Sequence, residues 1–288
     1  MTLLQIFFNC MTLGAIYALV AAGIVIVFKA TDLINFGAGD WVLGGAYIAL
    51  ALVIGGAPIW LTLILAPVGG VIMGILIDLL VFRRLLSASP WMFVVASLAV
   101  GGLLRELAIF RYQSQPFPFP AVFSREPFDV GGILFVPQNL WIVGATLVVF
   151  AALMLFFKYA RYGKALEAVA QNRTGAQIVG VNLRRSLMVT FGLAGGVSAI
   201  AAMLIAPSVD VSPEISVLVV SGFVAAAVGG LDSLGGALVG GFLVALIQTL
   251  TTVYISSSLA TIIVMLLLLV VMYVRPSGLF GSKVVQRV

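Results

Sequence analysis

The sequence predicts an all-α membrane protein, a polytopic transmembrane helical bundle of eight or nine spans in which one or two helices are short or interrupted. Hydrophobic residues fill 62% of the 288 positions and charged residues only 9%, whereas a soluble domain carries about 25% charge. The apolar residues occur in long runs, and a run of roughly 20 residues is enough to cross a bilayer. We therefore expect residues 1–288 to form a single transmembrane domain.

Polar segments separate these apolar runs. The candidate spans are Leu3–Phe28, Trp60–Phe82, Trp91–Phe110, Asn139–Phe157, Ser186–Ala206, Ala237–Tyr254 and Leu259–Val274. Two further segments, Trp41–Gly56 and Val217–Val228, are shorter, and either could be a half-helix. Gln113–Pro137 is rich in proline and phenylalanine. It predicts an external loop at the bilayer surface, because proline interrupts helices and aromatic side chains favour the membrane interface.

Side chains within the spans predict close helix packing and one internal ion pair. Small residues four apart let helices approach closely in lipid, and the sequence repeats this spacing at Gly70/Gly74, Gly192/Gly196 and Gly236/Gly240. Asp78 lies inside a candidate span, where an acid is a functional candidate by default. Because Arg83 follows five residues later, we expect the two to pair.

The distribution of basic residues predicts the orientation of the chain. Lys158–Arg185 is the longest polar interval, and short loops rich in lysine and arginine stay in the cytoplasm. With this loop inside, the C-terminus is cytoplasmic, and nine spans put the N-terminus outside. Then 12 of the 15 basic residues are cytoplasmic: Lys29, Arg83, Arg84, Lys158, Arg161, Lys164, Arg173, Arg184, Arg185, Arg275, Lys283 and Arg287.

Within the 158–185 loop, Ala165–Gly180 predicts one short helix with small side chains along one side. Such a face suits the groove of a cytoplasmic partner. The alternative is a solvated connector whose charges only set orientation. The length of the loop argues against that alternative, because helix–helix connections usually have about 2–8 residues.

The connector Ala30–Asp40 (ATDLINFGAGD) combines polar residues with glycines. It predicts either a helix break at membrane depth that lines a solute path, or a turn at the membrane surface. In the first case Asn35, Gly37, Gly39 and Asp40 are the candidate pathway residues. The stretch DWVLGGA that begins at Asp40 is similar to DSLGGA at Asp232. The two halves of the chain are either related by an internal repeat or alike by chance.

The sequence offers no basis for an enzyme. It has no histidine and a single cysteine, Cys10, and no phosphate-binding loop of the G-x-x-x-x-G-K-[ST] type. No metal-ligand cluster or nucleophile motif appears, so we expect no catalytic residue, no metal and no cofactor. The basic residues lie at the ends of spans, which indicates topology and not nucleic-acid binding.

Four stretches together resemble the inner-membrane permeases of branched-chain amino-acid ABC importers, of the LivH type. They are spread over nearly the whole chain in the family's order. They are LINFGAGDWVLGGAY (Leu33–Tyr47), ALEAVAQNRTGAQIVGVNLRR (Ala165–Arg185), AAAVGGLDSLGGALVGG (Ala225–Gly241) and RPSGLFG (Arg275–Gly281).

This resemblance implies a permease in the bacterial cytoplasmic membrane, working by alternating access. Its partners would be a second permease subunit, cytoplasmic ATP-binding subunits and an extracytoplasmic solute-binding protein. The 158–185 loop would be the coupling loop, with Leu166, Glu167, Arg173 and Gly180 against the ATPase. The family's signature usually has Ala-His where this chain has Gly37-Ala38, which leaves the solute open among branched-chain amino acids, urea, amides and carboxylates.

A secondary transporter or a channel is the alternative, because broken helices and related halves give a similar hydropathy pattern. An ion-coupled mechanism needs ionisable groups within the membrane, and Asp40 and Asp78 are its leading candidates. It needs no ATPase partner.

Overall fold

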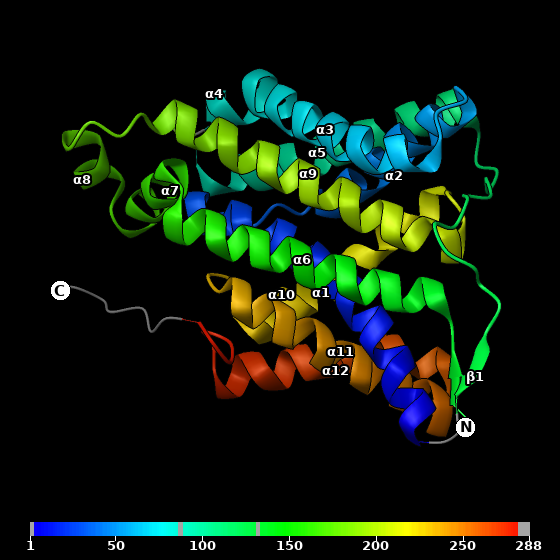
Figure 1. The fold of residues 1–288 in the computed structure, drawn as a ribbon. Helices are drawn as coiled ribbons and strands as arrows, with labels where there is room; N and C mark the ends of the chain where they lie inside the picture. The colour runs from blue at the N-terminus through cyan, green and yellow to red at the C-terminus, as the bar shows by residue number, and fades with distance from the viewer. Residues whose placement is uncertain (1–2, 86–88, 131–132, 282–288) are drawn as a thin grey trace. The chain divides into compact units, whose positions relative to one another are not determined.

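The computed structural model describes residues 3–85, 89–130 and 133–281. Residue contacts divide the chain into two compact units, and each is described by itself. Unit 1 comprises Met1–Val25, Ala121–Val148 and Val219–Val288, and unit 2 comprises Ile26–Pro120 and Val149–Leu218. Helices α1 (Leu3–Thr31) and α6 (Pro137–Tyr159) contribute residues to both units (Figure 1).

Unit 2 holds most of the helices of the first half of the chain, together with a long later helix. Its elements are α2 (Ala38–Ile54), α3 (Ile59–Ile77), the π-helical turn η1 (Asp78–Phe82), α4 (Arg83–Leu85), α5 (Pro90–Tyr112), α7 (Arg161–Gln171), α8 (Arg173–Ile178), α9 (Leu183–Val209) and the 3₁₀ helix η2 (Pro213–Val217).

Helices α3 and α9 pack backbone against backbone. A Cβ atom built on Gly70 would collide with the Gly195 carbonyl, and one on Gly74 would collide with the Phe191 carbonyl. Replacing these glycines therefore forces the helices apart. The close packing predicted from the small-residue spacing is confirmed for this pair of helices.

An aromatic cluster forms the core of unit 2. The Phe82 ring stacks on Phe191 with centroids 4.8 Å apart and packs beside Phe93 at 4.7 Å, while Trp41 lies 6.0 Å from Phe191. All four side chains are buried. Because they come from α2, η1, α5 and α9, the cluster fixes the start of α2 against three neighbouring elements.

The π-helical turn explains the predicted ion pair between Asp78 and Arg83. A π-helix bonds residue i to residue i+5, and the Arg83 N–H donates to the Asp78 carbonyl. The same spacing brings the side chains together, so Arg83 Nη2 lies 3.2 Å from Asp78 Oδ2. Asp78 is fully buried. The predicted pairing is confirmed.

Unit 1 contains the shorter half-helix of the second half of the chain and the two helices that follow it. Its elements, besides parts of α1 and α6, are β1 (Phe128–Val130), β2 (Ile133–Phe135), α10 (Leu218–Gly229), α11 (Leu234–Tyr254) and α12 (Ser257–Val274). The strands pair antiparallel with Phe128 opposite Phe135. This hairpin falls in Gln113–Pro137, the segment that the sequence predicted as an external loop.

The C-terminal RPSGLFG segment closes the end of α10. The Leu279 and Phe280 N–H groups donate to the Val228 and Gly229 carbonyls at 2.8 and 2.9 Å. Carbonyls at a helix C-terminus have no partner within the helix, so this segment supplies the missing donors. Lys283 and Arg287, which the sequence predicts to be cytoplasmic, lie outside the described residues.

Among the described residues, seven helices are long and apolar enough to cross a membrane, and Ala38–Ile54 and Pro213–Gly229 are shorter apolar helices. The fold class is therefore confirmed: an all-α polytopic bundle with short helices where the sequence places its two short segments.

Candidate functional site

The connector between α1 and α2 is a true interruption of helical structure. Helix α1 ends at Thr31, and Asp32 follows with a φ of 55°, a left-handed conformation that asparagine and aspartate tolerate better than most residues. Helix α2 starts only at Ala38, with Gly37 as its N-cap. The residues between them form no regular structure.

The end of this interruption packs beside the middle of α5. Gly37 and Asp40 press against α5, because a Cβ atom on Gly101 would collide with Asp40 Oδ2 and approach the Gly37 Cα. Gly101 is eleven residues from each end of the helix Pro90–Tyr112, which is roughly 16 Å at 1.5 Å per residue. Helix α5 is long and apolar enough to cross a membrane, so this position favours a break at membrane depth over a surface turn.

Side chains satisfy the backbone groups that the break leaves unpaired. Asn35 Oδ1 accepts from the Gly37 N–H at 3.1 Å, Ser97 Oγ accepts from the Phe36 N–H at 3.2 Å, and Thr31 Oγ1 accepts from the Leu33 N–H at 3.2 Å. Irregular backbone in a membrane is tolerated only where protein or a water-filled cavity supplies such partners. Asn35 and Gly37 thus shape the break, and Gly39 is buried in the first turn of α2.

Asp40 forms the charged centre of the site. Its Oδ1 lies 3.2 Å from Arg105 Nε, and Arg105 Nη2 donates to the Ser216 hydroxyl on η2. The side chains are not sealed, since 41% of Arg105 and 19% of Asp40 remains accessible. The contact is single, through Nε, so the guanidinium does not form the two-pronged pair typical of structural arginine–carboxylate bridges.

A second pair of side chains joins α2 and α5 further along. We call the Asp40–Arg105 pair the charged rung and the Tyr47–Tyr112 pair the aromatic rung. Tyr47 and Tyr112 stack with centroids 5.1 Å apart, and each lies seven residues beyond its helix's member of the Asp40–Arg105 pair. Seven residues are about two helical turns, so α2 and α5 run parallel with a charged rung and an aromatic rung about 10 Å apart. Tyr47 is only 6% exposed, and its hydroxyl has no hydrogen-bond partner among the described residues.

The 158–185 loop forms two helices, where the sequence predicted one over Ala165–Gly180. Asn172 ends α7 and caps α8, because its extended backbone breaks the helix and its Oδ1 accepts from the Gly175 N–H at 2.9 Å. The expectation of one continuous helix is therefore wrong. Both helices lie together at one end of unit 2 (Figure 1).

The exposed residues of this loop differ from those that the sequence singled out. Leu166 is buried, and the side chain of Arg173 lies outside the described residues, whereas Ile178 and Val179 at the end of α8 are 81% and 78% exposed. Gly180 follows with a φ of 88°, which glycine adopts without strain. The aliphatic pair was visible in the sequence as two large apolar residues within a polar loop.

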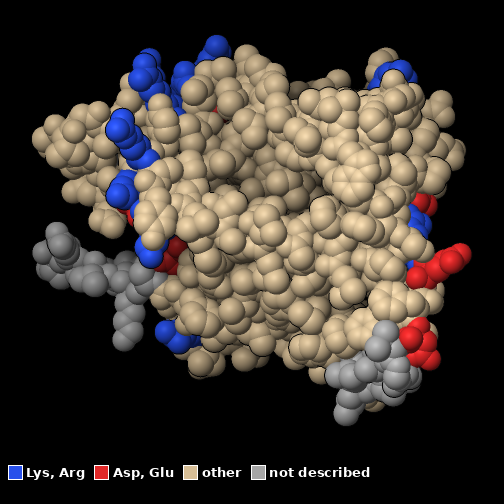
Figure 2. All heavy atoms as spheres, viewed as in Figure 1, with Lys and Arg blue, Asp and Glu red and all other residues tan. Residues whose placement is uncertain are grey.

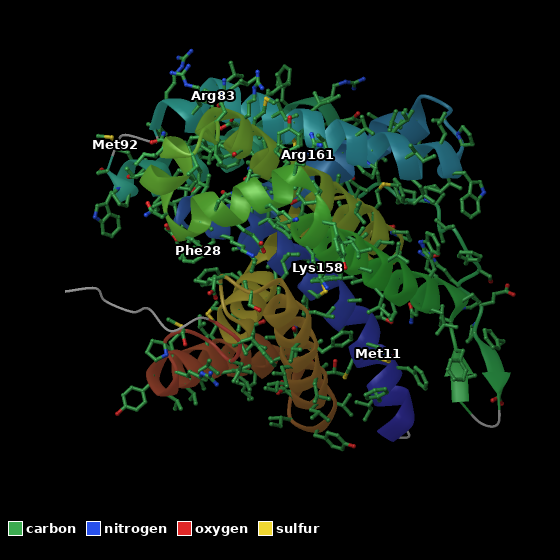
Figure 3. All side chains as sticks on the ribbon, turned by 60° about the vertical axis from the view of Figure 1, so that its left-hand side comes forward. Met11, Phe28, Arg83, Met92, Lys158 and Arg161 are labelled. Carbon is green, nitrogen blue, oxygen red and sulfur yellow. The ribbon has the colours of Figure 1, made fainter. Side chains whose placement is uncertain are left out.

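Basic side chains of unit 2 gather at the same end (Figure 2). Figure 3, turned so that this side comes forward, labels three of them, Arg83, Lys158 and Arg161, which come from α4, α6 and α7. One cation of this region is held internally: Lys29 Nζ lies 3.3 Å from Glu167 Oε1 and 5.0 Å from the centre of the Phe157 ring. This contact ties the end of α1, just before the break, to α7.

The sequence analysis singled out Asp40 but not Arg105 and Ser216, the residues that lie beside it. Arg105 was assigned only to the outer end of a span, and Ser216 drew no attention. The signal in the sequence that could have identified Arg105 was its position within an apolar run, where a charged residue is a functional candidate. Within the described residues, no group of three or more histidine, cysteine, aspartate or glutamate side chains could hold a metal ion.

Comparison with known proteins gives a consistent picture. A family model described as branched-chain amino acid transport system / permease component matches residues 6–274. The high-affinity branched-chain amino acid transport system permease protein LivH of Salmonella typhimurium is 28% identical, over 99% of this chain and 97% of its own. BraD of Pseudomonas aeruginosa, which carries the same description, is 26% identical over 99% and 98%.

A further relative overlaps a smaller part of the chain, and one solved structure is also similar. The probable branched-chain amino acid transport permease protein LivH of Methanocaldococcus jannaschii is 29% identical over 84% of this chain and 79% of its own. PsaBC from Streptococcus pneumoniae in complex with Fab covers 93% of this chain and 91% of that chain, at 15% identity with a TM-score of 0.48, too low to bear on the fold.

Proposed function

This chain belongs to the family of branched-chain amino-acid transport permeases and is the permease of such an ABC importer, and we propose that its solute path passes Asp40 and is driven through α7 and α8. The family resemblance seen in the sequence is confirmed by the match over residues 6–274. The observation that carries the proposed path is the broken connector, which brings an ion pair beside the midpoint of α5.

A helix break within the membrane is a natural element of a solute path. Short, interrupted segments let polar groups face a substrate at mid-membrane while the rest of each span stays apolar. Asn35, Gly37 and Gly39 shape the turn, and Asp40 presents charge. These four residues are the proposed pathway set, and Arg105 and Ser216 join them because of their contacts with Asp40 and with each other.

The driving force enters through the cytoplasmic loop. Helix α8 presents Ile178 and Val179, two exposed aliphatic side chains suited to an apolar groove of an ATP-binding subunit. Glu167 links α7 to Lys29, so a push on the loop reaches the end of α1 and then the connector. In this scheme Leu166 anchors α7 from within, Gly180 permits the turn after α8, and Arg173 and Glu167 border the contact.

The importer needs partners because the chain has no phosphate-binding loop. ATP-binding subunits and an extracytoplasmic solute-binding protein follow from the family. A second permease subunit completes the proposed assembly, placed in a bacterial cytoplasmic membrane with the 158–185 loop and the C-terminus inside. The gathering of basic side chains around α4 and α7 supports this orientation (Figure 2).

Reconstitution tests the coupling surface. The permease pair, its ATPases and its binding protein are placed in proteoliposomes, and Ile178→Ser/Val179→Ser is compared with Ile54→Ser, an exposed aliphatic residue at the end of α2. Burying one aliphatic side chain contributes about 1.5–3 kcal/mol, so we expect binding-protein-stimulated ATP hydrolysis to fall at least about tenfold in the α8 variant and to stay unchanged in Ile54→Ser.

Equal stimulation in both variants would argue against the α8 contact. Uptake by the permease alone, driven by an ion gradient and without ATPases, would instead support the secondary-transporter alternative.

Orientation has a direct test, because the natural cysteine is buried. Cys10 is the only cysteine in the chain, so Ile178→Cys introduces one accessible thiol. A membrane-impermeant maleimide is expected to label it in inverted membrane vesicles and to leave it unlabelled in intact cells. Labelling of intact cells would place α8 on the outer side and overturn the topology.

A further inference from the structure

The charged rung of α2 and α5 has features that a purely structural ion pair lacks. A structural bridge inside a membrane is expected to be sealed and fully hydrogen-bonded, because exposed charge in apolar surroundings is costly. The Asp78–Arg83 pair follows that pattern only in burial: Asp78 is fully buried, but Asp78 Oδ1 and Arg83 Nε have no hydrogen-bond partner among the described residues. Arg105 and Asp40 are instead 41% and 19% exposed, although they lie beside the middle of a span.

Arg105 and Asp40 also keep hydrogen-bonding atoms that their contacts with each other and with Ser216 do not use. Arg105 contacts Asp40 through Nε and Ser216 through Nη2, and neither contact engages Nη1. Asp40 accepts from Arg105 through Oδ1 and also has a side-chain hydrogen bond with Ser216. An arginine fork binds a carboxylate best with two parallel N–H groups, and a carboxylate has acceptor sites to spare beyond one hydrogen bond. Donors and acceptors of opposite charge therefore lie side by side with capacity left.

The aromatic rung two turns away adds a second, independent observation. The Tyr47 hydroxyl is buried without a partner among the described residues, and a buried polar group without a partner destabilises a protein by about 1–3 kcal/mol. Such groups require an explanation, and an unseen ligand or water is one. Tyr47 lies on the same face of α2 as Asp40, seven residues on.

Resting on the proposed function, we infer that Asp40 and Arg105 form a transient subsite for the charged groups of a zwitterionic α-amino acid. Arg105 receives the carboxylate through its guanidinium fork, and Asp40 receives the ammonium group. The ammonium and carboxylate groups of the ligand are bonded to the same carbon, and the two protein charges are in contact at 3.2 Å, so one zwitterion replaces a single ion pair with two complementary contacts. Urea and simple amides carry no such charges, and the subsite selects against them.

This exchange of ion-pair partners keeps the binding of the solute weak enough for its release. While the path is empty, Asp40 and Arg105 neutralise each other, so no isolated charge faces the membrane interior. When the solute leaves, the protein pair re-forms. The Tyr47–Tyr112 rung lies at the end of α5, about two turns from the subsite, where we place the side chain of the amino acid.

The test separates solute handling from folding and from coupling. Arg105→Gln and Asp40→Asn are placed in the reconstituted importer, with Glu106→Gln as the matched control, because it neutralises the neighbouring charge on an exposed face of the same helix. Both uptake of L-leucine and binding-protein-stimulated ATP hydrolysis are measured. We expect leucine transported per ATP to fall at least about tenfold in both site variants, with ATP hydrolysis retained and the control unchanged.

The double variant Asp40→Asn/Arg105→Gln distinguishes a subsite from a structural bridge. The two amide side chains still hydrogen-bond to each other at similar size, so a purely structural role predicts recovered uptake. We expect a normal thermal midpoint and uptake per ATP that stays at least about tenfold low. Wild-type uptake in this double variant would overturn the inference.

Two further measurements separate failure of the subsite from failure of the proposed function. If Arg105→Gln fails to assemble, Arg105→Lys decides, because it keeps the charge and loses the fork. We expect it to lower uptake per ATP at least about threefold, and an unchanged ratio overturns the subsite. If the wild-type chain shows no ATP-driven leucine uptake, the proposed function itself fails, which is a different result from a wild type that transports and site variants that transport equally well.

Discussion

Helices α2 and α11 share the stretch Leu-Gly-Gly-Ala, at Leu43–Ala46 and at Leu234–Ala237, and an aspartate precedes it in both, yet the two regions differ in what they expose. In each, the second glycine meets a neighbouring backbone: Gly45 lies against Ala199 of α9, and Gly236 lies against Gly229 of α10. The shared letters thus serve a shared purpose, which is close helix packing. They are compatible with an internal repeat, which stays a hypothesis.

The aspartates separate the two sites. Asp40 is the third residue of α2, inside the first turn, whereas Asp232 precedes Ser233, the N-cap of α11. Helix α2 begins two residues before its aspartate, whereas α11 begins two residues after its aspartate. Within the turn, the Asp40 side chain projects sideways to Arg105 on α5. The comparison teaches that spacing to the helix start, and not the motif alone, determines whether the acid can join a path.

The backbone solutions differ as well. The break before α2 relies on side chains, from Thr31, Asn35 and Ser97. The turn before α11 uses one side chain and backbone: Ser233 Oγ accepts from the Gly236 N–H at 3.0 Å, and the N–H groups of the 279–280 segment donate to the last carbonyls of α10. The first break stays open to a charged pair, whereas the second is closed in part by backbone.

The largest effect is expected when a larger side chain replaces a glycine at the start of α2, in comparison with the same change at the start of α11. Gly37→Val places a side chain against the Ser97 carbonyl, whereas Gly235→Val at the start of α11 meets open space. Overpacking costs about 1–3 kcal/mol, occasionally more, so we expect the first variant to lose most of its folded protein and the second to keep it. Monodispersity in size-exclusion chromatography and the thermal midpoint measure this. Equal loss in both variants would mean that the break is no more sensitive to added bulk than the start of α11.

The next prediction compares the two aspartates, Asp40 in the first turn of α2 and Asp232 just before α11. Asp40→Asn weakens a charge-assisted contact that contributes about 1.5–3 kcal/mol, and 1.36 kcal/mol corresponds to a tenfold change in rate. We expect leucine uptake to fall at least about tenfold in Asp40→Asn and by less than about twofold in Asp232→Asn. Initial uptake rates in proteoliposomes provide the measurement. A greater loss in Asp232→Asn would reverse the assignment of the path.

A smaller effect is expected from the side chains that cap the two starts. Asn35→Ala leaves the buried Gly37 N–H without its acceptor, at about 1–3 kcal/mol. Ser233→Ala removes an ordinary N-cap, at about 0.5–2 kcal/mol. Denaturation in detergent is expected to rank Asn35→Ala as the more destabilising. The opposite ranking would show that the break before α2 is not held by side chains.

The smallest effect concerns the tie between α1 and α7. The side chains of Lys29 and Glu167 are 25% and 42% exposed, and exposed ion pairs contribute about 0.2–1 kcal/mol. A double-mutant cycle with Lys29→Gln and Glu167→Gln is expected to give a stability coupling in that range. A coupling near zero would remove this contact as a route from α7 to the connector.

Much of the architecture could be predicted from the sequence alone. Hydropathy runs marked the spans and both short helices, because crossing lipid imposes length and apolarity on consecutive residues. The five-residue spacing of Asp78 and Arg83 was enough to predict their pairing. The division of the cytoplasmic loop at Asn172 was missed, since small helix-forming residues continue through it and only the capping contact to Gly175 reveals the break.

The site itself depended on tertiary structure. The sequence by itself determined that the chain is a helical membrane permease without its own ATP-binding loop, and that a polar, glycine-bearing break follows the first span. Which part of α5 the break packs against, and which residue faces Asp40, was decided by the tertiary fold. Asp40 and Arg105 are 65 positions apart, and local periodicity carries no information about such a contact. Only the folded chain brings the two charges to the same depth.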